Sequence, residues 1–529
     1  MKLIQDNKNL ISLVLSATFV VVCVIIFALG VRGNYGNPSS RELSFSGWKE
    51  DGPFELSPER GRFALLYSFM EDHSLNFSIP LARFSAPDIA VNSKGQYASL
   101  FMPGVSFLVI PGYVLGKYFG ASQVGTFAMI SIFALANIFL IRAIVIRLGA
   151  NKIAASLAGF TFVFATPAFA YGVTLYQHHI STFIILLSLY ILLRWKNAWS
   201  LGVIWFLCAL SVVIDNPNFF LMLPIGIYAL GRIISFEKIK TAYVMNIKPV
   251  LFLTLITVAI PVGFFLWFNK ASYGNPLQLP GTSVSVAEID ENGKSVEADT
   301  KSILTGSSRD EVSKEKTAVG FFQTRNLLNG LYIHTLSPDR GILRFAPVIL
   351  LGIIGMVLLY RRNKEFANLL TVIIGINVLL YSMWGDPWGG WAFGSRYLIP
   401  TYALLAIGLG IVLSKWSKKI WFLVIFAFLF VYSAGVGTLG ALTSNVNPPQ
   451  VQVLQLEKIS GTIQRYSFDR NWQFLNESGS KSFIFRTFAR NIFSAQTYYF
   501  SVYGLIVITG IFMLTMLAIN INKQEDIKK

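Results

Sequence analysis

Charged residues are scarce in this chain of 529 residues. Asp, Glu, Lys and Arg make up 13% of it, and hydrophobic residues make up 54%. A soluble domain carries about 25% charged residues, so this chain has too little polar surface to cover a water-soluble body of its size. The mean hydropathy is +0.56. These values exclude a soluble enzyme and a disordered protein.

Cysteine is also rare. The two cysteines, Cys23 and Cys208, both lie within apolar runs. They are typical of packing residues, and they exclude a disulfide-rich secreted module.

The few charges that remain are unbalanced, with 44 Lys and Arg against 27 Asp and Glu. In a soluble protein this excess would suggest nucleic-acid binding. In a membrane protein, Lys and Arg gather in the cytoplasmic loops. We therefore expect no nucleic-acid partner.

Long apolar runs dominate what is present. A membrane-spanning helix needs about 20 mostly apolar residues, and twelve segments are candidates. They are residues 10–31, 121–141, 154–173, 179–193, 198–214, 217–235, 249–269, 343–360, 366–384, 397–414, 419–441 and 498–520. A thirteenth run, 100–119, is interrupted by Pro103, Gly104, Pro111 and Gly112.

The distribution of positive charge decides how run 100–119 lies. If it does not cross and the amino terminus is cytoplasmic, the Lys and Arg residues of the short loops face inside, except for Arg396. If it crosses, every later loop violates the positive-inside rule. We therefore expect a re-entrant or interfacial helix, whose Pro and Gly breaks are tolerated when protein covers it.

The expected fold is an all-α polytopic bundle of about twelve transmembrane helices with both termini cytoplasmic. Residues 1–441 form the main module, with outer loops at 33–120 and 271–342. Residues 442–497 form a further outer loop, and 498–529 form the last transmembrane helix and a cytoplasmic tail. The polar stretch 281–318 is expected to be a flexible flap.

The first outer loop contains a helix start. Ser57 suits the cap and Pro58 the first helical position. The helix is expected to run to Met70 and to lie on the membrane surface. Its apolar stripe consists of Phe63, Leu66 and Met70.

Two acids of this loop are candidate catalytic residues. Glu59 shares a helix face with Arg62, three residues later. It is alternatively a helix-dipole acid in a salt bridge with Arg62. Asp88 follows Pro87 and is alternatively the first residue of an Asx turn.

Three more polar patches lie on the outer side. Tyr176–His179 contains adjacent histidines that face different sides of a helix, so it shows no metal-ligand pattern. Residues 334–341 precede a span. Residues 384–397 combine glycines with tryptophans, which simple membrane anchoring does not need. The alternatives are an interfacial anchor for the first patch and an aromatic belt with a snorkelling Arg396 for the third.

Taken together, these segments resemble the GT-C superfamily of integral-membrane glycosyltransferases, in particular its aminoarabinose, mannosyl and RgtA-like branches. The resemblance rests on Ser57–Phe63, on Ser337–Gly341 and on Trp388–Tyr397, and it covers roughly residues 10–415. In the family the first loop holds a catalytic carboxylate, usually Asp. This chain has Glu59 at that position, and Asp88 is the rival in the same loop.

The resemblance implies transfer of a sugar from a polyprenyl-phosphate donor to a lipid, glycan or protein acceptor on the non-cytoplasmic face. Glu59 or Asp88 would act as general base, and Arg340, Arg396 or Lys117 would stabilise the leaving phosphate. The implied substrate-binding residues are Arg62, His73, Lys94, Tyr97, Lys117, Gln177, His178, His179, Asp339, Arg340, Asp386, Trp388, Arg396 and Tyr397.

The partners implied are the lipid-linked donor and membrane lipid, and the location is a prokaryotic cytoplasmic membrane. No cofactor is expected. Some relatives use a divalent metal, but no ligand set is visible in the sequence.

Two other functions fit the composition. A secondary transporter should place ionisable residues near the centres of its spans, whereas these spans are almost free of charge there. A non-catalytic scaffold with the same fold would tolerate replacement of the family's acid.

Overall fold

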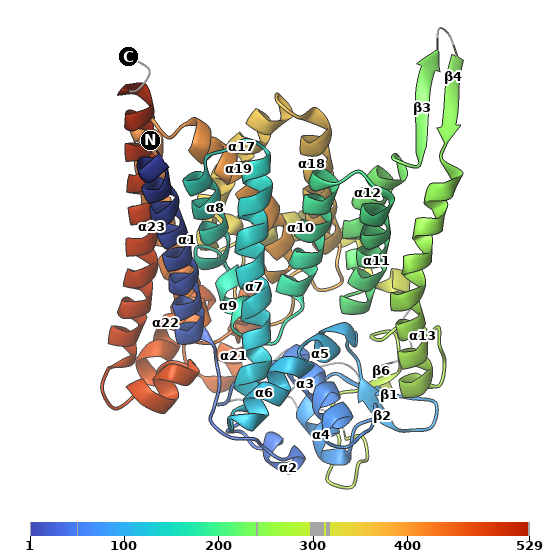
Figure 1. The fold of residues 1–529 in the computed structure, drawn as a ribbon. Helices are drawn as coiled ribbons and strands as arrows, with labels where there is room; N and C mark the ends of the chain where they lie inside the picture. The colour runs from blue at the N-terminus through green and yellow to red at the C-terminus, as the bar shows by residue number, and fades with distance from the viewer. Residues whose placement is uncertain (1, 50, 240–241, 297–311, 314–317, 527–529) are drawn as a thin grey trace.

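Long apolar helices form a bundle in the computed structural model, which describes residues 2–49, 51–239, 242–296, 312–313 and 318–526. Both chain ends lie at one end of this bundle, as Figure 1 shows. The bundle helices are α1 (Lys2–Gly30), α7 (Ser122–Arg147), α8 (Lys152–Phe164), α10 (His178–Arg194), α11 (Ala198–Ile214), α12 (Asn218–Leu230), α13 (Ala259–Tyr273), α17 (Leu351–Tyr360), α18 (Lys364–Ser382), α19 (Ile399–Lys415), α20 (Ile420–Leu442) and α23 (Ala495–Asp526).

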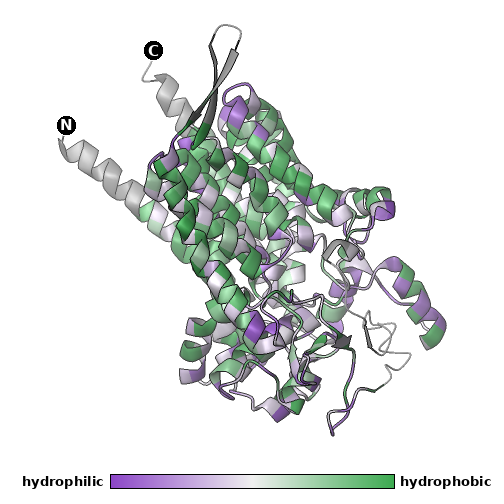
Figure 2. Ribbon diagram, turned by 90° about the vertical axis from the view of Figure 1, so that its right-hand side faces the viewer, coloured by the Kyte–Doolittle hydropathy of each residue, from purple (hydrophilic) through white to green (hydrophobic). Residues whose placement is uncertain are grey.

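Within the described residues, six helices are long and apolar enough to cross a membrane, and six shorter apolar helices accompany them. Hydrophobic residues predominate in the bundle, and hydrophilic residues become frequent towards its ends (Figure 2). The protein is therefore an integral membrane protein. The twelve spans and their orientation stay predictions, because half of these helices are shorter than a full span.

Helix α19 occupies the centre of the bundle. Of its most apolar window, 89% is buried, against 6% for the peripheral segment Pro249–Tyr273. It packs against α17 through glycines. A Cβ atom at Gly355 would lie 1.7 Å from the carbonyl oxygen of Gly408, so the two backbones touch without side chains between them.

Shorter elements gather at the end of the bundle opposite the termini (Figure 1). They are α2 (Ser40–Leu43), α3 (Ser57–Met70), α4 (Ile79–Ser85), α5 (Gly104–Leu108), α6 (Ile110–Tyr118), α21 (Gln450–Ser460) and α22 (Ser467–Glu477). The remaining short helices are α9 (Ala168–Gly172), α15 (Leu327–Thr335) and α16 (Ile342–Phe345). We call the end that carries α3 the outer end.

Run 100–119 forms the two short helices α5 and α6, which meet at Val109. Both lie beside α3 at the outer end and do not pass through the bundle (Figure 1). Pro111 is the second residue of α6, in the first turn, where its missing N–H is harmless to the helix. The arrangement is the one that the charge pattern favours.

The all-α expectation is wrong in one respect, because the chain also forms small antiparallel sheets. One has the order β2-β1-β5-β6, and β3 pairs with β4 in the other. The strands are β1 (Ile89–Val91), β2 (Tyr97–Ser99), β3 (Ile234–Ile239), β4 (Ala242–Ile247), β5 (Ser285–Val286) and β6 (Val312–Ser313). The strands of the larger sheet have only two or three residues, which is too short to show an alternating pattern in sequence. The strands β3 and β4 have six residues each and were not predicted from the sequence.

The polar stretch 281–318 contributes β5 and β6 to the larger sheet, where Ala90 of β1 lies opposite Ser285. Part of this stretch is therefore ordered against the first outer loop. Residues 297–311 and 314–317, which make up half of the expected flap, lie outside the described residues.

Helix α3 has the predicted bounds but not the predicted cap or surroundings. Leu56 is the cap residue, and its N–H donates to the Glu59 carboxylate at 3.2 Å. The hydroxyl of Ser57 instead donates to Asp88 at 2.5 Å. Residues Glu59 to Leu66 are all buried, because α4, α5 and β2 cover the helix. It therefore lies inside the outer end and not on a membrane surface.

Candidate functional site

Glu59 lies in the first turn of α3 with none of its surface exposed. One carboxylate oxygen accepts the N–H of Leu56, and the other, Oε1, has no hydrogen-bond partner in the described structure. A buried carboxylate that is half unpaired is costly in a folded protein. Such a group is therefore a candidate for chemistry and not only for structure.

Arg62, one turn further along α3, does not form the expected salt bridge with Glu59. It donates to the main-chain oxygen of Pro58 at 3.0 Å and to Oε1 of Gln177 at 2.6 Å. Gln177 in turn donates to the carboxylate of Asp215 at 3.1 Å. A chain of hydrogen bonds thus connects the outer loop, the start of α10 and the end of α11.

Arg396 enters the same region from the turn before α19. Its guanidinium group lies 5.3 Å from the ring centre of Tyr176 and 5.4 Å from that of Tyr397. The ring of Tyr397 stacks on Tyr381 at 4.2 Å between ring centres. These aromatic faces hold the guanidinium plane through cation–π contact, and Arg396 also hydrogen-bonds to the Tyr397 side chain. Nε and Nη1 of Arg396 have no partner in the described structure.

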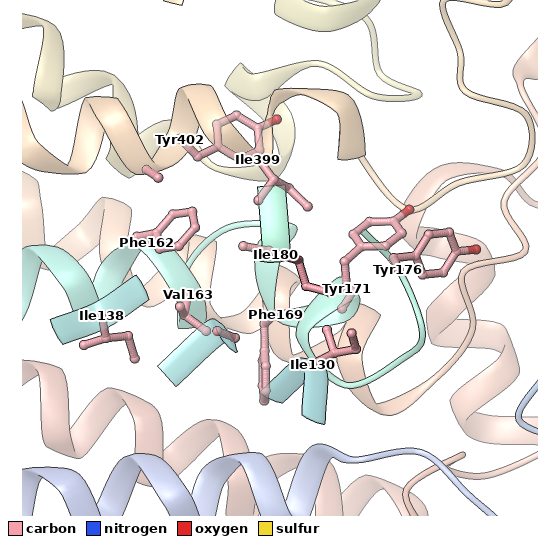
Figure 3. Close-up of a cluster of buried hydrophobic side chains, with 14 of the residues drawn as sticks. Ile130, Ile138, Phe162, Val163, Phe169, Tyr171, Tyr176, Ile180, Ile399 and Tyr402 are labelled. Atoms are coloured by element: carbon pink, nitrogen blue, oxygen red, sulfur yellow. The ribbon is translucent and has the colours of Figure 1, made fainter. Parts of the chain in front are cut away.

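Tyr176 stands at the border between this polar region and the apolar core. Figure 3 shows its ring next to that of Tyr171 at the edge of a cluster of buried hydrophobic side chains. The two rings meet edge to face at 5.0 Å, and Tyr176 stacks on His178 at 5.9 Å. The polar groups of this region therefore lie next to the apolar core of the bundle.

Unpaired polar atoms concentrate here. In the described part of the chain, six fully buried atoms of this region have no hydrogen-bond partner. They are Oε1 of Glu59, Nε of Arg62, Oη of Tyr176, Nε2 of His178, and Nε and Nη1 of Arg396. Buried polar groups are nearly always paired, so this concentration marks a site that is completed by water or by a ligand. We call these five residues with Gln177 and Asp215 the arginine–glutamate site.

Electrostatic interactions tie the site together. Burial, reinforced by the neighbouring charge of Glu55, raises the pKa of Glu59 to about 7. Burial also lowers the pKa of Arg62 to about 10, although Asp215 opposes that shift. Arg62 and Tyr176 each interact electrostatically with both Glu59 and Arg396. The carboxylate of Glu59 is therefore within electrostatic range of Arg62, and Arg62 is within electrostatic range of Arg396.

Of the residues predicted from sequence, Glu59, Arg62, Gln177, His178, Arg396 and Tyr397 come together in this region. His179 does not, since its ring points into the bundle and lies 2.8 Å from the carbonyl oxygen of Ala168. The two adjacent histidines thus face different sides, as their positions on a helix predict.

Asp339, Arg340, Asp386 and Trp388 form a neighbouring group. Arg340 is fully buried and donates only to main-chain oxygens, those of Trp388, Asp339, Gly390 and Asn447. Asp386 accepts the N–H of Trp388 at 3.2 Å. In this arrangement Arg340 fixes the glycine-rich turn that carries Arg396, which makes it a positioning residue.

The other candidates lie away from the site. Asp88 is half-buried beside Ser57. Lys117 forms an ion pair with Glu71 at 2.7 Å, and His73 and Lys94 are exposed. The hydroxyl of Tyr97 donates to the carbonyl of Gly293. None of these side chains is placed to meet Arg396 in this structure.

Sequence reasoning missed Asp215 and Glu55. Asp215 is an isolated acid between two apolar helices, and that position alone could have singled it out. Glu55 lies four residues before Glu59 and is fully buried in ion pairs with Arg32 at 2.8 Å and Lys481 at 2.6 Å. Its partners come from distant parts of the chain, which no local pattern reveals.

Among the described residues, no three His, Cys, Asp or Glu side chains lie together as they would in a metal site.

Two crystal structures of ArnT from Cupriavidus metallidurans are similar to this chain at 12% identity. The apo structure gives a TM-score of 0.45 and covers 96% of this chain and 78% of its own. The structure bound to undecaprenyl phosphate gives 0.46, with 95% and 76% covered. No family model and no curated protein matches the chain.

Archaeal oligosaccharyltransferase AglB from Archaeoglobus fulgidus, in complex with an inhibitory peptide and a dolichol-phosphate, gives a TM-score of 0.34 at 13% identity. It covers 93% of this chain and 56% of its own. At these identities and TM-scores the chemistry has to be argued from the residues of the site.

Proposed function

We propose that this protein is a GT-C-type glycosyltransferase that moves a sugar from a polyprenyl-phosphate donor to an acceptor at the outer end of the bundle. The observation that carries the proposal is the buried carboxylate of Glu59, which is unpaired at Oε1 in the described structure and interacts electrostatically with the guanidinium group of Arg62, as Arg396 also does. A base and cations for a leaving phosphate are the two things that this transfer requires.

The roles follow from the geometry. Glu59 takes the proton of an acceptor hydroxyl or amine while that atom bonds to the anomeric carbon of the sugar. The bond between the anomeric carbon and the phosphate oxygen breaks, and its electron pair leaves with the phosphate. The unpaired Nε and Nη1 of Arg396 are donors for that phosphate. Gln177 and Asp215 fix the orientation of Arg62.

The pKa of Glu59, raised by burial to about 7, suits this role. A carboxylate with an ordinary pKa is a weak base at neutral pH, whereas one with a pKa near 7 accepts a proton readily and is still about half ionised. Glu in place of the family's usual Asp extends the same group by one methylene.

Replacement of Glu59 tests the proposal. The protein is purified into lipid vesicles and supplied with polyprenyl-phosphate sugars of several kinds, and cleavage of the sugar–phosphate bond is followed by mass spectrometry. We expect E59Q to lose activity about 10²–10⁴-fold and E59D to retain part of it. E71Q is the matched control, because Glu71 lies at the other end of α3 in a surface ion pair with Lys117.

Other outcomes separate the alternatives. Full activity in E59Q would show that Glu59 is not the base, and D88N then tests the rival acid. Movement of intact donor across the vesicle membrane without bond cleavage would identify a transporter. Binding of donor without cleavage or movement would identify a non-catalytic scaffold.

A further inference from the structure

A second polar cavity, of about 150 Å³, opens at the outer end between the first outer loop and residues 442–497. Glu55 and Lys481 line it as buried side chains, and Val446, Arg470 and Phe474 line it as partly exposed ones. One water needs about 10–15 Å³, so the cavity has room for a group of several non-hydrogen atoms.

The cavity carries excess positive charge. Glu55 is the one acid in its lining, and it is already paired with both Lys481 and Arg32, at 2.6 and 2.8 Å. Arg470 adds a third cation. Three cations beside one carboxylate produce a positive field that attracts an anion to this place.

Arg470 is one of the residues that line the cavity. In the described structure it donates no hydrogen bond and forms no ion pair, and its contact is with the ring of Trp391 at 5.9 Å. An arginine held by an aromatic face with its N–H groups unused is suited to bidentate binding of a carboxylate or phosphate.

Asn447 offers the complementary group. Only 1% of it is exposed, and its amide nitrogen donates to Asn471 at 2.7 Å, which fixes the side chain. Its Oδ1 is buried without a partner in the described structure. Because an amide oxygen accepts hydrogen bonds, Oδ1 of Asn447 could bind a hydroxyl or amine of the ligand whose anionic group Arg470 binds.

Glu55 links this cavity to the arginine–glutamate site. Its charge, with those of Arg32 and Lys481, acts directly on the carboxylate of Glu59. A charged ligand on the cavity side of Glu55 would therefore act on the same charges that set the pKa of the proposed base.

We propose that this cavity binds an anionic, hydroxyl-bearing sugar unit of the acceptor, an assignment that rests on the proposed glycosyl transfer. Arg470 binds the carboxylate or phosphate, Lys481 adds to the positive field, and Oδ1 of Asn447 accepts a sugar hydroxyl.

Ligand binding to the purified full-length protein in lipid nanodiscs tests this assignment. Glucuronate, glucose 6-phosphate, glucose and inorganic phosphate are titrated by calorimetry. We expect the two charged sugars to bind at least tenfold more tightly than glucose or phosphate alone. The tighter of the two identifies the anionic group as carboxylate or phosphate.

Three variants locate the binding. R470Q should weaken binding of the charged sugars at least tenfold, and V446W should block the rim of the cavity. R465Q, which removes an exposed arginine outside the cavity, should bind like wild type. Equal binding of glucose and glucuronate, or equal affinities of R470Q and R465Q, would overturn the assignment. Tight binding of inorganic phosphate alone would also overturn it.

E59Q separates this proposal from the proposed function. The variant should bind the charged sugars like wild type while it loses transfer. If E59Q transfers sugar normally, the catalytic assignment fails and the cavity stands as a binding site. If transfer depends on Glu59 but R470Q binds like wild type, the cavity assignment fails alone.

Discussion

Glu55 and Lys481 join the first outer loop to the segment before the last helix, with 2.6 Å between Oε1 of the carboxylate and Nζ of the ammonium. Both side chains are buried, and Arg32 completes the group from the end of α1. Arg32 also donates to the main chain of Ala441 at 3.0 Å. Three segments that are remote in sequence are thus held together by one carboxylate.

Loss of this carboxylate should destabilise the fold. E55Q leaves Arg32 and Lys481 buried without a counter-charge, and removal of one partner of a buried ion pair costs about 3–5 kcal/mol. Thermal unfolding of the detergent-solubilised protein measures the effect. K117M is the control, because the Lys117–Glu71 pair is partly exposed and such pairs contribute about 0–1 kcal/mol. Equal melting temperatures for the two variants would contradict the prediction.

The same group predicts a loss of stability in acid. Burial disfavours the charged form of Glu55, but Lys481 and Arg32 outweigh it and hold the pKa below its ordinary value. A carboxylate whose pKa is depressed in the folded state stabilises the protein above the unfolded pKa, and this contribution is lost as pH falls through the folded pKa. The melting temperature should therefore fall below about pH 4 in wild type, and this fall should be smaller in E55Q.

Contact between α17 and α19 should be equally sensitive to a single methyl group. G355A places a Cβ atom 1.7 Å from the carbonyl oxygen of Gly408, so the two helices must separate and lose their close packing. G375A is the matched control, since nothing lies within 4 Å of the Cβ position there. We expect a melting temperature several degrees lower for G355A and unchanged for G375A. If both variants melt alike, the helices are not packed as the structure has them.

Much of the bundle follows from hydropathy, because hydropathy depends on local composition. Helix α3 was predictable in its bounds, since Pro58 and the acid in the first turn favour a helix start. Its cap and its burial were not. The Ser57 hydroxyl donates to Asp88 and so does not cap the helix. Burial comes from α4, α5 and β2, which cover the helix. Both are tertiary effects.

The site was predictable only in part, for the same reason. Polar residues at the ends of apolar helices are candidates for function. This pattern identified Glu59, Arg62, Gln177 and Arg396. Their hydrogen bonds could not be predicted, since Arg62 was expected to pair with its neighbour Glu59 and instead reaches Gln177. Arg340 was a candidate for binding the leaving phosphate, but its guanidinium group donates hydrogen bonds to four main-chain oxygens.

Glu59 should give sugar transfer a characteristic pH dependence. Its pKa is raised to about 7 by burial, and only the deprotonated form can act as base. The value of kcat/KM should rise about tenfold per pH unit below 7 and level off above it. Initial rates between pH 5.5 and 8.5 measure this. A profile that is flat or falling across that range would show that Glu59 does not act as a base of this pKa.

Burial of Glu59 also predicts an effect on stability that is independent of activity. A carboxyl group whose pKa is raised on folding is bound to its proton more tightly in the folded state, so stability falls as pH rises from the unfolded pKa towards 7. E59Q carries no charge at any pH. It should therefore melt above wild type at pH 8 and close to it at pH 5. A variant that melts below wild type at pH 8 would indicate that the charged form is stabilised in the fold.

Arg396 should matter through its planar donors and not only through its charge. R396K keeps a positive charge at the site but removes the Nε and Nη1 groups that have no partner in the described structure. If these donors bind the leaving phosphate, kcat/KM for cleavage of the donor falls by about 10²–10³-fold. R325K, at an exposed arginine bonded to Gln323, should leave the rate unchanged. A normal rate for R396K would assign the leaving-group role to Arg62, whose Nε is likewise unpaired, and R62K would then show the loss.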